Sequence, residues 1–564
     1  MSLITSKGML DKAALELGRR RDAFARLGIP ERIGLLDRLT AATLACAADQ
    51  VRVASWAKGI EVDSPAAAEE WLGGPVTVLR NLRLLRRSLR EIARRGKPSP
   101  GRVRARADGQ VVAEVFPGSL ADRLLLGGFR AEVWMEPGLT PEALPEAMAS
   151  SYPPDPQAEG RTCLVLGAGN VASIGPMDVL YKSFVENQVC VLKLNPVNDY
   201  LGRFIEKAFG PMIDEGFLQV VYGGPEEGDR LVHHSDVDEI HITGSHLTHD
   251  AIVWGEAGEE RERNKRAGTP LVSKRITSEL GCVTPVVIAP GPWSEAELDL
   301  QAENVASMVV NNASFNCNAA KLLVTSSRWP QREAFLAKLR DVLTGIPPRR
   351  AYYPGSDERY DRFLAAYPDA DAVAGRTETH LPWTLIPGLD PEGDHLAFTT
   401  EAWCGVLAET ALDADGAEFL DRAAAFCNDR VWGTLSCSLL VHPKSRSDPA
   451  VEQALDRALA ELRYGGVTVN HWCALGYGLV SPTWGAFPGH PLDDVQSGIG
   501  VVHNTRMFAR PQKSVVHGPF VARPKPPWFA TNKNAHKVAA GMARFEARGS
   551  LLAIPGVAVQ ALRG

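Results

Sequence analysis

The stretch TCLVLGAGNVASIGPMDVLYKSFVENQVCVLKLNP, residues 162–196, decides the fold class. An apolar run at 163–166 is followed by a glycine-rich turn, a helix-length segment at 177–186 and a second apolar run at 189–194. Short, nearly continuous apolar runs are typical of strands that are buried on both faces, as in a parallel sheet covered by helices. The stretch therefore predicts a βαβ unit.

The same alternation continues toward the C-terminus. It predicts helices at 201–213 and 228–234, strands at 218–222 and 239–243, and a charged, glycine-containing loop or hairpin at 256–274. Further apolar runs between 283 and 441 predict a second α/β domain. The predicted fold class is thus α/β, with a doubly wound parallel sheet whose carboxyl edge is where nucleotides usually bind.

The two ends of the chain have different patterns. Apolar residues between 33 and 92 recur mostly at three- and four-residue steps, which predicts helices with an arginine-rich face over 80–95. Because acidic residues lie beside and within this face, and no aromatic residues are interleaved, we interpret it as a solvated helix surface rather than a nucleic-acid site. The tail from Arg510 is rich in Pro, Lys and aromatic residues and is expected to be strapped over a surface.

Composition and charge exclude several classes of protein. The 564 residues include 61 Lys+Arg and 67 Asp+Glu, a formal net charge of −6, so the chain lacks the basic character of a nucleic-acid-binding protein. Hydrophobic residues make up 45% and charged residues 23%, which excludes a disordered or collagen-like chain. No run approaches the roughly 18 apolar residues of a membrane span, and charges interrupt the N-terminal segment. We expect a cytoplasmic, multidomain protein with neither a membrane nor a nucleic-acid partner.

The cysteines indicate neither a zinc site nor a disulfide framework. Nine of them are scattered and never spaced as Cys-x-x-Cys, so no metal is expected. Cys317 differs from the others because it lies in a polar turn, Asn312-Ala-Ser-Phe-Asn316-Cys317-Asn-Ala319. A lone cysteine is by default a small buried hydrophobe, so the turn by itself leaves both a nucleophile and a core residue open.

Two further polar residues stand at expected turns of the chain. Glu279 lies at the end of a strand-like run in Ser278-Glu-Leu-Gly281, where a surface or helix-capping role is the simpler reading. Asn170 follows Gly167-Ala-Gly169, which lacks the further glycine of the dinucleotide fingerprint. Its amide is suited either to capping the next helix or to donating to a developing oxyanion.

Taken in order, these segments resemble the aldehyde dehydrogenase superfamily. The similar segments are Val191–Pro196 (the cofactor lysine motif), 228–245 (the nicotinamide side), Glu279-Leu280-Gly281 (the general base), Asn312–Ala319 (the nucleophile loop), Asn428 with Trp432-Gly433, Gly466–Asn470 and Ser497–Gly500. The resemblance covers about residues 25–505. It implies catalytic roles for Cys317, Glu279 and Asn170, and cofactor contacts for Lys193, Gly244, Ser245 and Glu401.

The sequence departs from the family pattern at several of these places. Ser314, Phe315 and Asn316 replace the usual Gly-Gln before the cysteine, and Glu401 stands one residue early in its motif. Pro196 occupies the position of a glutamate that many NAD-preferring members use, which leaves the choice between NAD and NADP open.

The resemblance also implies an organisation. A cofactor-binding domain is expected at 1–128 and 152–278, a catalytic domain at 279–490, and an oligomerisation element with a C-terminal tail at 129–151 and 491–564. A homodimer or homotetramer is expected.

The leading functional hypothesis is NAD(P)-dependent oxidation of an aldehyde to a carboxylic acid through a cysteine thiohemiacetal and thioester. Because the Gly-Ala-Gly-Asn170 turn also resembles bacterial acyl-CoA reductases, a CoA-dependent reductase or acylating dehydrogenase is an alternative. A catalytically inactive scaffold of the same fold is a third. The sequence does not identify the aldehyde. Six aromatic residues would form a bulky apolar pocket if they converged, although each such residue is more often part of the core than of a substrate wall: Trp293, Phe315, Trp403, Trp472, Trp484 and Phe487.

Overall fold

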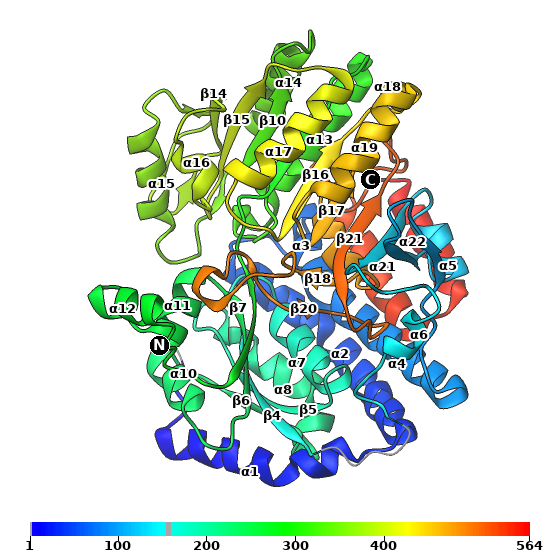
Figure 1. Ribbon diagram of the computed structural model, residues 1–564, viewed down its shortest axis with the longest axis vertical. Coiled ribbons are helices and arrows are strands. Elements are labelled where there is room, and N and C mark those ends of the chain that lie inside the picture. The colour runs from blue at the N-terminus through cyan, green and yellow to red at the C-terminus, as the bar shows by residue number, and fades with distance from the viewer. Residues whose placement is uncertain (1–2, 154–158) are drawn as a thin grey trace.

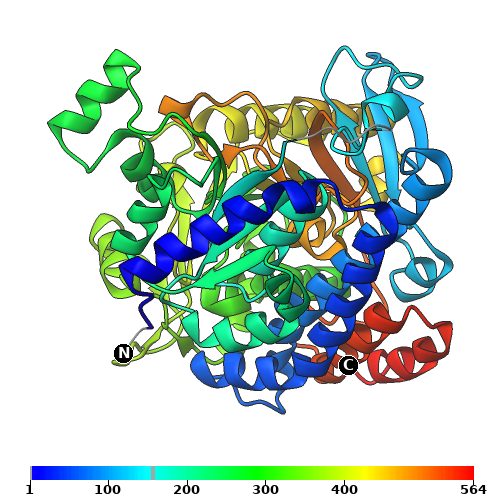
Figure 2. The same ribbon diagram turned by 90° about the horizontal axis from the view of Figure 1, so that it is seen from below.

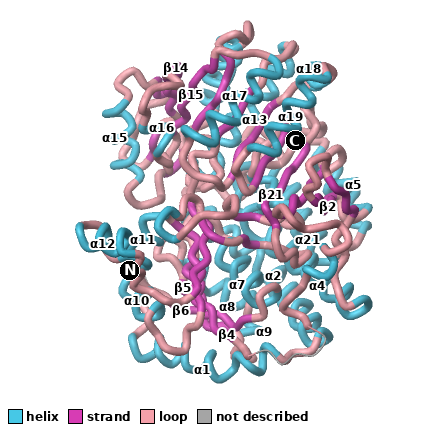
Figure 3. Tube along the Cα trace, viewed as in Figure 1, coloured by secondary structure: helices cyan, strands magenta, loops and turns pink. Residues whose placement is uncertain are grey.

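The structure, a computed structural model, describes residues 3–153 and 159–564. Its two large sheets occupy the lower and upper parts of the view in Figure 1. Both are mainly parallel and are flanked by helices, as the tube in Figure 3 shows. The predicted α/β class with a doubly wound parallel sheet is therefore confirmed. None of the helices in the described ranges is both long and apolar enough to cross a membrane.

The six-stranded sheet is built from the stretch that decides the fold. Its strands, in spatial order, are β19 (Gly498–Ile499), β8 (Arg275–Leu280), β7 (Glu239–Gly244), β4 (Arg161–Leu166), β5 (Gln188–Lys193) and β6 (Leu218–Val221). All neighbours pair in parallel except β19 with β8. The chain runs from β4 to β6 on one side and continues with β7 on the other, so the topological switch point lies between β4 and β7.

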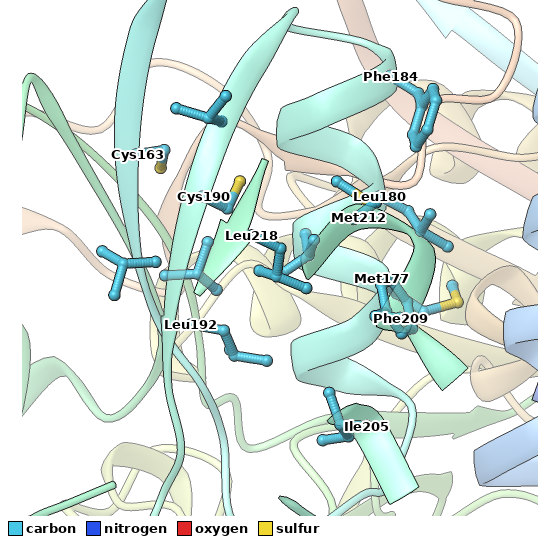
Figure 4. Packing of buried hydrophobic residues seen from close by; sticks show 14 of the residues in the cluster. Cys163, Met177, Leu180, Phe184, Cys190, Leu192, Ile205, Phe209, Met212 and Leu218 are labelled. Atoms are coloured by element: carbon cyan, nitrogen blue, oxygen red, sulfur yellow. The ribbon is translucent and has the colours of Figure 1, made fainter. Parts of the chain in front are cut away.

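Helices cover both faces of this sheet. They are α1 (Lys7–Ala25), α2 (Ile29–Ala57), α4 (Thr77–Arg95), α7 (Ile174–Phe184), α8 (Gly202–Ala208), α9 (Gly210–Asp214), α10 (Pro225–Val232) and α11 (His246–Trp254). Figure 2 shows α1 lying across the sheet. Figure 4 shows the packing between β5 and α7, where Cys190 and Leu192 lie near Leu180 and Met177. The nearly continuous apolar strands are thus buried on both faces.

The eleven-stranded sheet carries the second half of the chain. Its order is β1 (Arg102–Ala105), β2 (Val111–Phe116), β3 (Arg130–Met135), β21 (Pro511–His517), β17 (Gly466–Val469), β16 (Ser436–Leu440), β9 (Pro285–Ile288), β10 (Leu322–Ser326), β15 (Val406–Leu412), β14 (Thr384–Leu389) and β12 (Asp371–Ala372). Its main helices are α13 (Glu295–Val310), α14 (Arg332–Gly345), α17 (Gly416–Arg430) and α19 (Pro449–Glu461). Although β1 and β2 fall within 1–128, they belong to this sheet; the division into domains stays a proposal.

The expectation that the tail from Arg510 is strapped over a surface is wrong for its first part. Strand β21 is an interior strand that pairs in parallel with β17 and antiparallel with β3. Lys513 is buried in it because its amine donates to three carbonyls, those of Leu459, Ala460 and Leu462. Pro511 stands at the first position of the strand, where proline is tolerated, so the composition of the tail misled the prediction.

Two other predictions need correction. Residues 256–274, expected as a loop or hairpin, contain helix α12 (Glu259–Ala267), whose acidic first turn and basic last turn favour a helix. The arginine face of α4 is not wholly solvated. Arg80 and Arg83 bond to Glu546 of the C-terminal helix α21 (Ala535–Arg548) at 2.8 and 2.6 Å.

Candidate active site

The structure brings Cys317 and Glu279 together from different sheets. Cys317 lies between helix α13 and strand β10, whereas Glu279 is in strand β8. The Sγ atom of Cys317 is 3.3 Å from Oε1 of Glu279, within hydrogen-bonding distance for a thiol donor. The indole N–H of Trp484 donates to the same carboxylate oxygen at 3.0 Å. The candidate site therefore lies where the edges of the two sheets meet.

Burial controls the protonation of this pair. Desolvation raises the pKa of Glu279 to about 7, although the hydrogen bonds from Trp484 and Cys317 act in the opposite direction. The pKa of the Cys317 thiol is raised well above its ordinary value, first by burial and then by the charges of Glu279 and Glu401. The resting cysteine is thus a protonated thiol, and the Glu279 carboxylate is placed to accept its proton.

Asn170 faces the same cavity as Cys317, at the turn after β4. Its side-chain Nδ2 donates to the carbonyl oxygen of Phe315 at 2.9 Å, so it holds the turn that precedes the nucleophile. Its own carbonyl oxygen accepts from Nζ of Lys58 at 2.9 Å and from Nδ2 of Asn312 at 3.0 Å. The backbone around Asn170 is therefore rigid, as a preorganised donor requires.

The turn before Cys317 has an unusual backbone. Asn312, Ala313 and Ser314 have φ values of 53°, 55° and 66°, three consecutive non-glycine residues in the left-handed region. Such residues cost of order 1 kcal/mol or more each and persist only where the surroundings hold them. Glu69 accepts from the backbone N–H of Asn312 at 3.0 Å, and Lys58 donates to its Oδ1 at 3.0 Å.

Sequence reasoning missed Lys58, Glu69 and Tyr352. Tyr352 donates to Asn312 Oδ1 at 2.9 Å, so it supports the same turn as Lys58. Lys58 follows the last turn of α2, 112 residues before Asn170 and 254 before Asn312. No periodicity or spacing links such distant residues. The asparagines of the turn before Cys317 were the one feature of the sequence that indicated a polar network there.

Three of the predicted cofactor residues lie at the carboxyl edge of the six-stranded sheet. Lys193 ends β5, Gly244 ends β7, and Ser245 caps α11 by accepting from the backbone N–H of Thr248 at 3.2 Å. Burial lowers the pKa of Lys193 to about 8. Within residues 3–153 and 159–564 its amine takes part in no hydrogen bond or ion pair, although the charge of Glu227 acts to raise its pKa. This edge contains the switch point, where the fold class binds nucleotides.

Glu401 has a different location. Its carboxylate accepts from the backbone N–H of Cys282 at 3.4 Å and pairs with Lys321 at 3.3 Å. It passes so close to Gly281 that a Cβ atom there would be 1.9 Å from Oε2. Glu401 thus contacts the residues that follow Glu279 in the chain, Gly281 and Cys282. The structure does not place it with Lys193, Gly244 and Ser245.

A cavity of about 170 Å³ leads to Cys317 and Asn170. Of the six aromatic residues that would form a pocket if they converged, Trp472 alone is among the lining residues. Trp293 packs instead against Trp329 at 4.9 Å between ring centroids, and Phe315 packs against Tyr352 at 5.0 Å. These six aromatic residues therefore do not converge on the cavity.

Comparison with known sequences gives the following relatives. A model of the aldehyde dehydrogenase family matches residues 188–353. An aminoacetaldehyde dehydrogenase of Pseudomonas aeruginosa is 29% identical over 301 residues, which are 50% of this chain and 53% of the relative. An N-succinylglutamate 5-semialdehyde dehydrogenase of Novosphingobium aromaticivorans is 25% identical over 186 residues, 32% of this chain and 36% of the relative. The alignments thus span about half or less of these curated relatives.

Comparison with solved structures covers nearly the whole chain. The NADP-dependent glyceraldehyde-3-phosphate dehydrogenase of Bacillus halodurans, complexed with NADP, has a TM-score of 0.60 at 17% identity, covering 91% of this chain and 92% of its own. Aldehyde dehydrogenase C of Pseudomonas syringae, with NAD⁺ and octanal, has a TM-score of 0.59 at 15% identity, covering 92% and 90%. At these identities the likeness concerns the fold.

Proposed function

We propose that this chain, a member of the aldehyde dehydrogenase superfamily, oxidises an aldehyde to a carboxylic acid with NAD or NADP. The observation that carries the proposal is the 3.3 Å contact between the thiol of Cys317 and the carboxylate of Glu279, together with the cavity that Cys317 and Asn170 both line. The names of the relatives support the reaction class. The solved structures with NADP or NAD⁺ support the cofactor.

The chain's own residues supply the covalent steps. Glu279 accepts the proton of Cys317, and the thiolate forms a C–S bond with the aldehyde carbon. The amide of Asn170 and the backbone N–H of Cys317 donate to the oxyanion. A bound nicotinamide would supply the hydride acceptor, and loss of the hydride would leave the acyl group on Cys317 as a thioester. After Glu279 has released the proton of Cys317 to solvent, it takes a proton from water, whose oxygen attacks the thioester carbon. The C–S bond then breaks, which releases the acid and leaves Cys317 as a thiolate.

The carboxyl edge of the six-stranded sheet fits the cofactor. The half-buried amine of Lys193 lacks a partner in the described ranges, and its lowered pKa shows that burial disfavours its charge. Hydroxyl or phosphate groups of a nucleotide would provide that partner. We propose that Lys193 holds the adenosine ribose and that Gly244 and Ser245 approach the nicotinamide side, with Glu401 behind the catalytic carboxylate.

The direct test measures NAD(P)H production from a panel of aldehydes, with and without CoA. We expect production without CoA. Strict dependence on CoA would instead support the CoA-dependent alternative, and no production with any aldehyde would support the inactive scaffold.

Because all nine cysteines are unpaired, we also propose a reducing location such as the cytoplasm. A homodimer or homotetramer stays a prediction.

The Asn170→Ala variant is expected to lower hydride formation by about a hundredfold, the usual cost of one oxyanion donor. Single-turnover NAD(P)H formation measures this step. Asn264, on the remote helix α12, provides the matched control: its alanine variant should retain the wild-type rate. A change in cofactor affinity alone at Asn170 would reassign this residue to the nucleotide site.

NADP should be accepted, and its use should depend on pH through Lys193. The amine is charged below its pKa of about 8 and attracts a 2′-phosphate, so kcat/KM for NADP should fall as pH rises through this range. The Lys193→Met variant should lose this limb. A preference for NAD above about a thousandfold, roughly 4 kcal/mol, would contradict the prediction.

A further inference from the structure

The C-terminal segment forms part of the wall of the catalytic cavity. Trp528 precedes helix α21 and Met542 lies within it, and both line the cavity that reaches Cys317. Figures 1 and 2 show this segment, in red, beside the N-terminal helices. The wall is therefore made by residues more than 200 positions after the nucleophile.

Buried ion pairs fix this wall in place. Glu546, one turn after Met542, bonds to Arg80 and Arg83 of α4. The side chain of Glu546 is 2% exposed and that of Arg80 is 7% exposed. Helix α4 begins at Thr77, which with Val76 lines the same cavity. The ion pairs thus hold α21 against α4 at the place where both helices contribute to the cavity.

The lining of this cavity is mainly apolar. Its apolar side chains include Leu72, Val76, Ile174, Leu475, Leu479 and Met542. The polar lining groups gather close to Cys317, where Asn170, Asn312 and Asn316 lie. A substrate whose carbonyl meets Cys317 therefore projects the rest of its chain among apolar side chains.

The charged groups at the cavity are already neutralised. Lys58 donates to Glu70 at 2.8 Å and to two further oxygens, those of Asn170 and Asn312, so all three of its N–H groups are used. Glu69 is bound by Arg349 through two hydrogen bonds of 3.2 and 3.1 Å. A substrate ammonium or carboxylate in this cavity would consequently be desolvated without a counter-ion.

We propose that the substrate is an aldehyde with an uncharged, apolar chain, and that the C-terminal wall at Met542 and Trp528 limits the length of that chain. The proposal rests on the function proposed above, because it assigns the substrate of the same site. Each buried methylene contributes about 0.8 kcal/mol, which corresponds to a gain of about fourfold in kcat/KM. The gain stops when the chain reaches the wall.

The first experiment measures kcat/KM for straight-chain aldehydes of two, four, six and eight carbons. A gain of about fourfold per methylene is expected until the wall is reached. Six-carbon aldehydes with a terminal ammonium or carboxylate should react at least a hundredfold more slowly than the uncharged one. Equal rates along the series, or equal rates for the charged aldehydes, would overturn the inference and leave the proposed function intact.

The Met542→Trp variant tests the wall itself. It should lower kcat/KM for the eight-carbon aldehyde at least tenfold and leave the two-carbon aldehyde within twofold. Leu552→Trp is the matched control, since Leu552 lies in the same segment, is 91% exposed and does not line the cavity. Equal effects of Met542→Trp on both aldehydes would overturn the role of the wall.

Protection of Cys317 from alkylation can be measured without turnover, so it separates the proposed function from the inference about the apolar cavity. Straight-chain alcohols of the same lengths should protect Cys317 from alkylation by iodoacetamide, with the protecting concentration falling about fourfold per methylene. Such protection together with no NAD(P)H from any aldehyde would reject the proposed function and support the apolar cavity. Protection that does not depend on chain length would overturn the cavity inference, whether or not aldehydes react.

Discussion

The Cys317→Ala variant is expected to lose aldehyde oxidation completely while it keeps its fold and its affinity for the cofactor. The thiol supplies the atom that bonds to the aldehyde carbon, so its removal deletes the covalent route. The side chain lies at the cavity and between the sheets, and it is removed without disturbing any strand pairing. NAD(P)H formation measures the loss, and circular dichroism with cofactor titration checks the fold.

The matched control is Cys46→Ala, a buried cysteine on helix α2 that does not line the cavity. Its activity should stay within twofold of the wild type. Residual activity of Cys317→Ala within about tenfold of the wild type, a loss of only ~1.4 kcal/mol, would reject Cys317 as the nucleophile.

The Glu279→Gln variant is expected to reduce steady-state turnover by about a hundredfold to ten-thousandfold, the usual range for a general base. Glutamine preserves the size of the side chain but accepts no proton. Because Glu279 contacts the thiol directly at 3.3 Å, the burst of NAD(P)H should survive but become slower. Stopped-flow measurement of the burst separates it from the turnover that follows.

The pH profile provides an independent test of the same residue. The base is ionised above its pKa of about 7, so kcat/KM should rise through pH 7 and fall as the pH decreases below it. This acid limb should be absent in Glu279→Gln.

Rescue by an external thiol identifies the step that is lost. Added β-mercaptoethanol should restore part of the steady-state rate, because a thiol needs less help than water to attack the thioester. An unchanged steady state in Glu279→Gln would contradict its role in water activation and shift support to CoA as the acyl acceptor.

The contacts of Lys58 and Glu69 with Asn312 are a part of the candidate site that the sequence could not predict. Asn170 and Cys317 stand at turns beside apolar runs, and Glu279 stands near the end of strand β8, so the types and positions of these residues were visible in the sequence. Lys58 and Glu69 stand on N-terminal helices, and their contacts with Asn312 form only when those helices pack beside the nucleophile turn.

The sequence by itself determined the parallel sheet of the first half. The apolar runs at 163–166, 189–194 and 239–243 became β4, β5 and β7 because such runs have to be buried on both faces. The carboxyl edge with Lys193, Gly244 and Ser245 followed directly from that topology.

Only the tertiary structure decided where the C-terminal tail from Arg510 lies. Strand β21 enters the middle of the eleven-stranded sheet, and Met542 reaches the catalytic cavity, although the tail looked like a surface segment. The physical reason is that hydrophobic periodicity records which face of an element is buried but not which distant partner buries it. Contacts such as Glu546 with Arg80, 466 residues apart, leave no local pattern in the sequence.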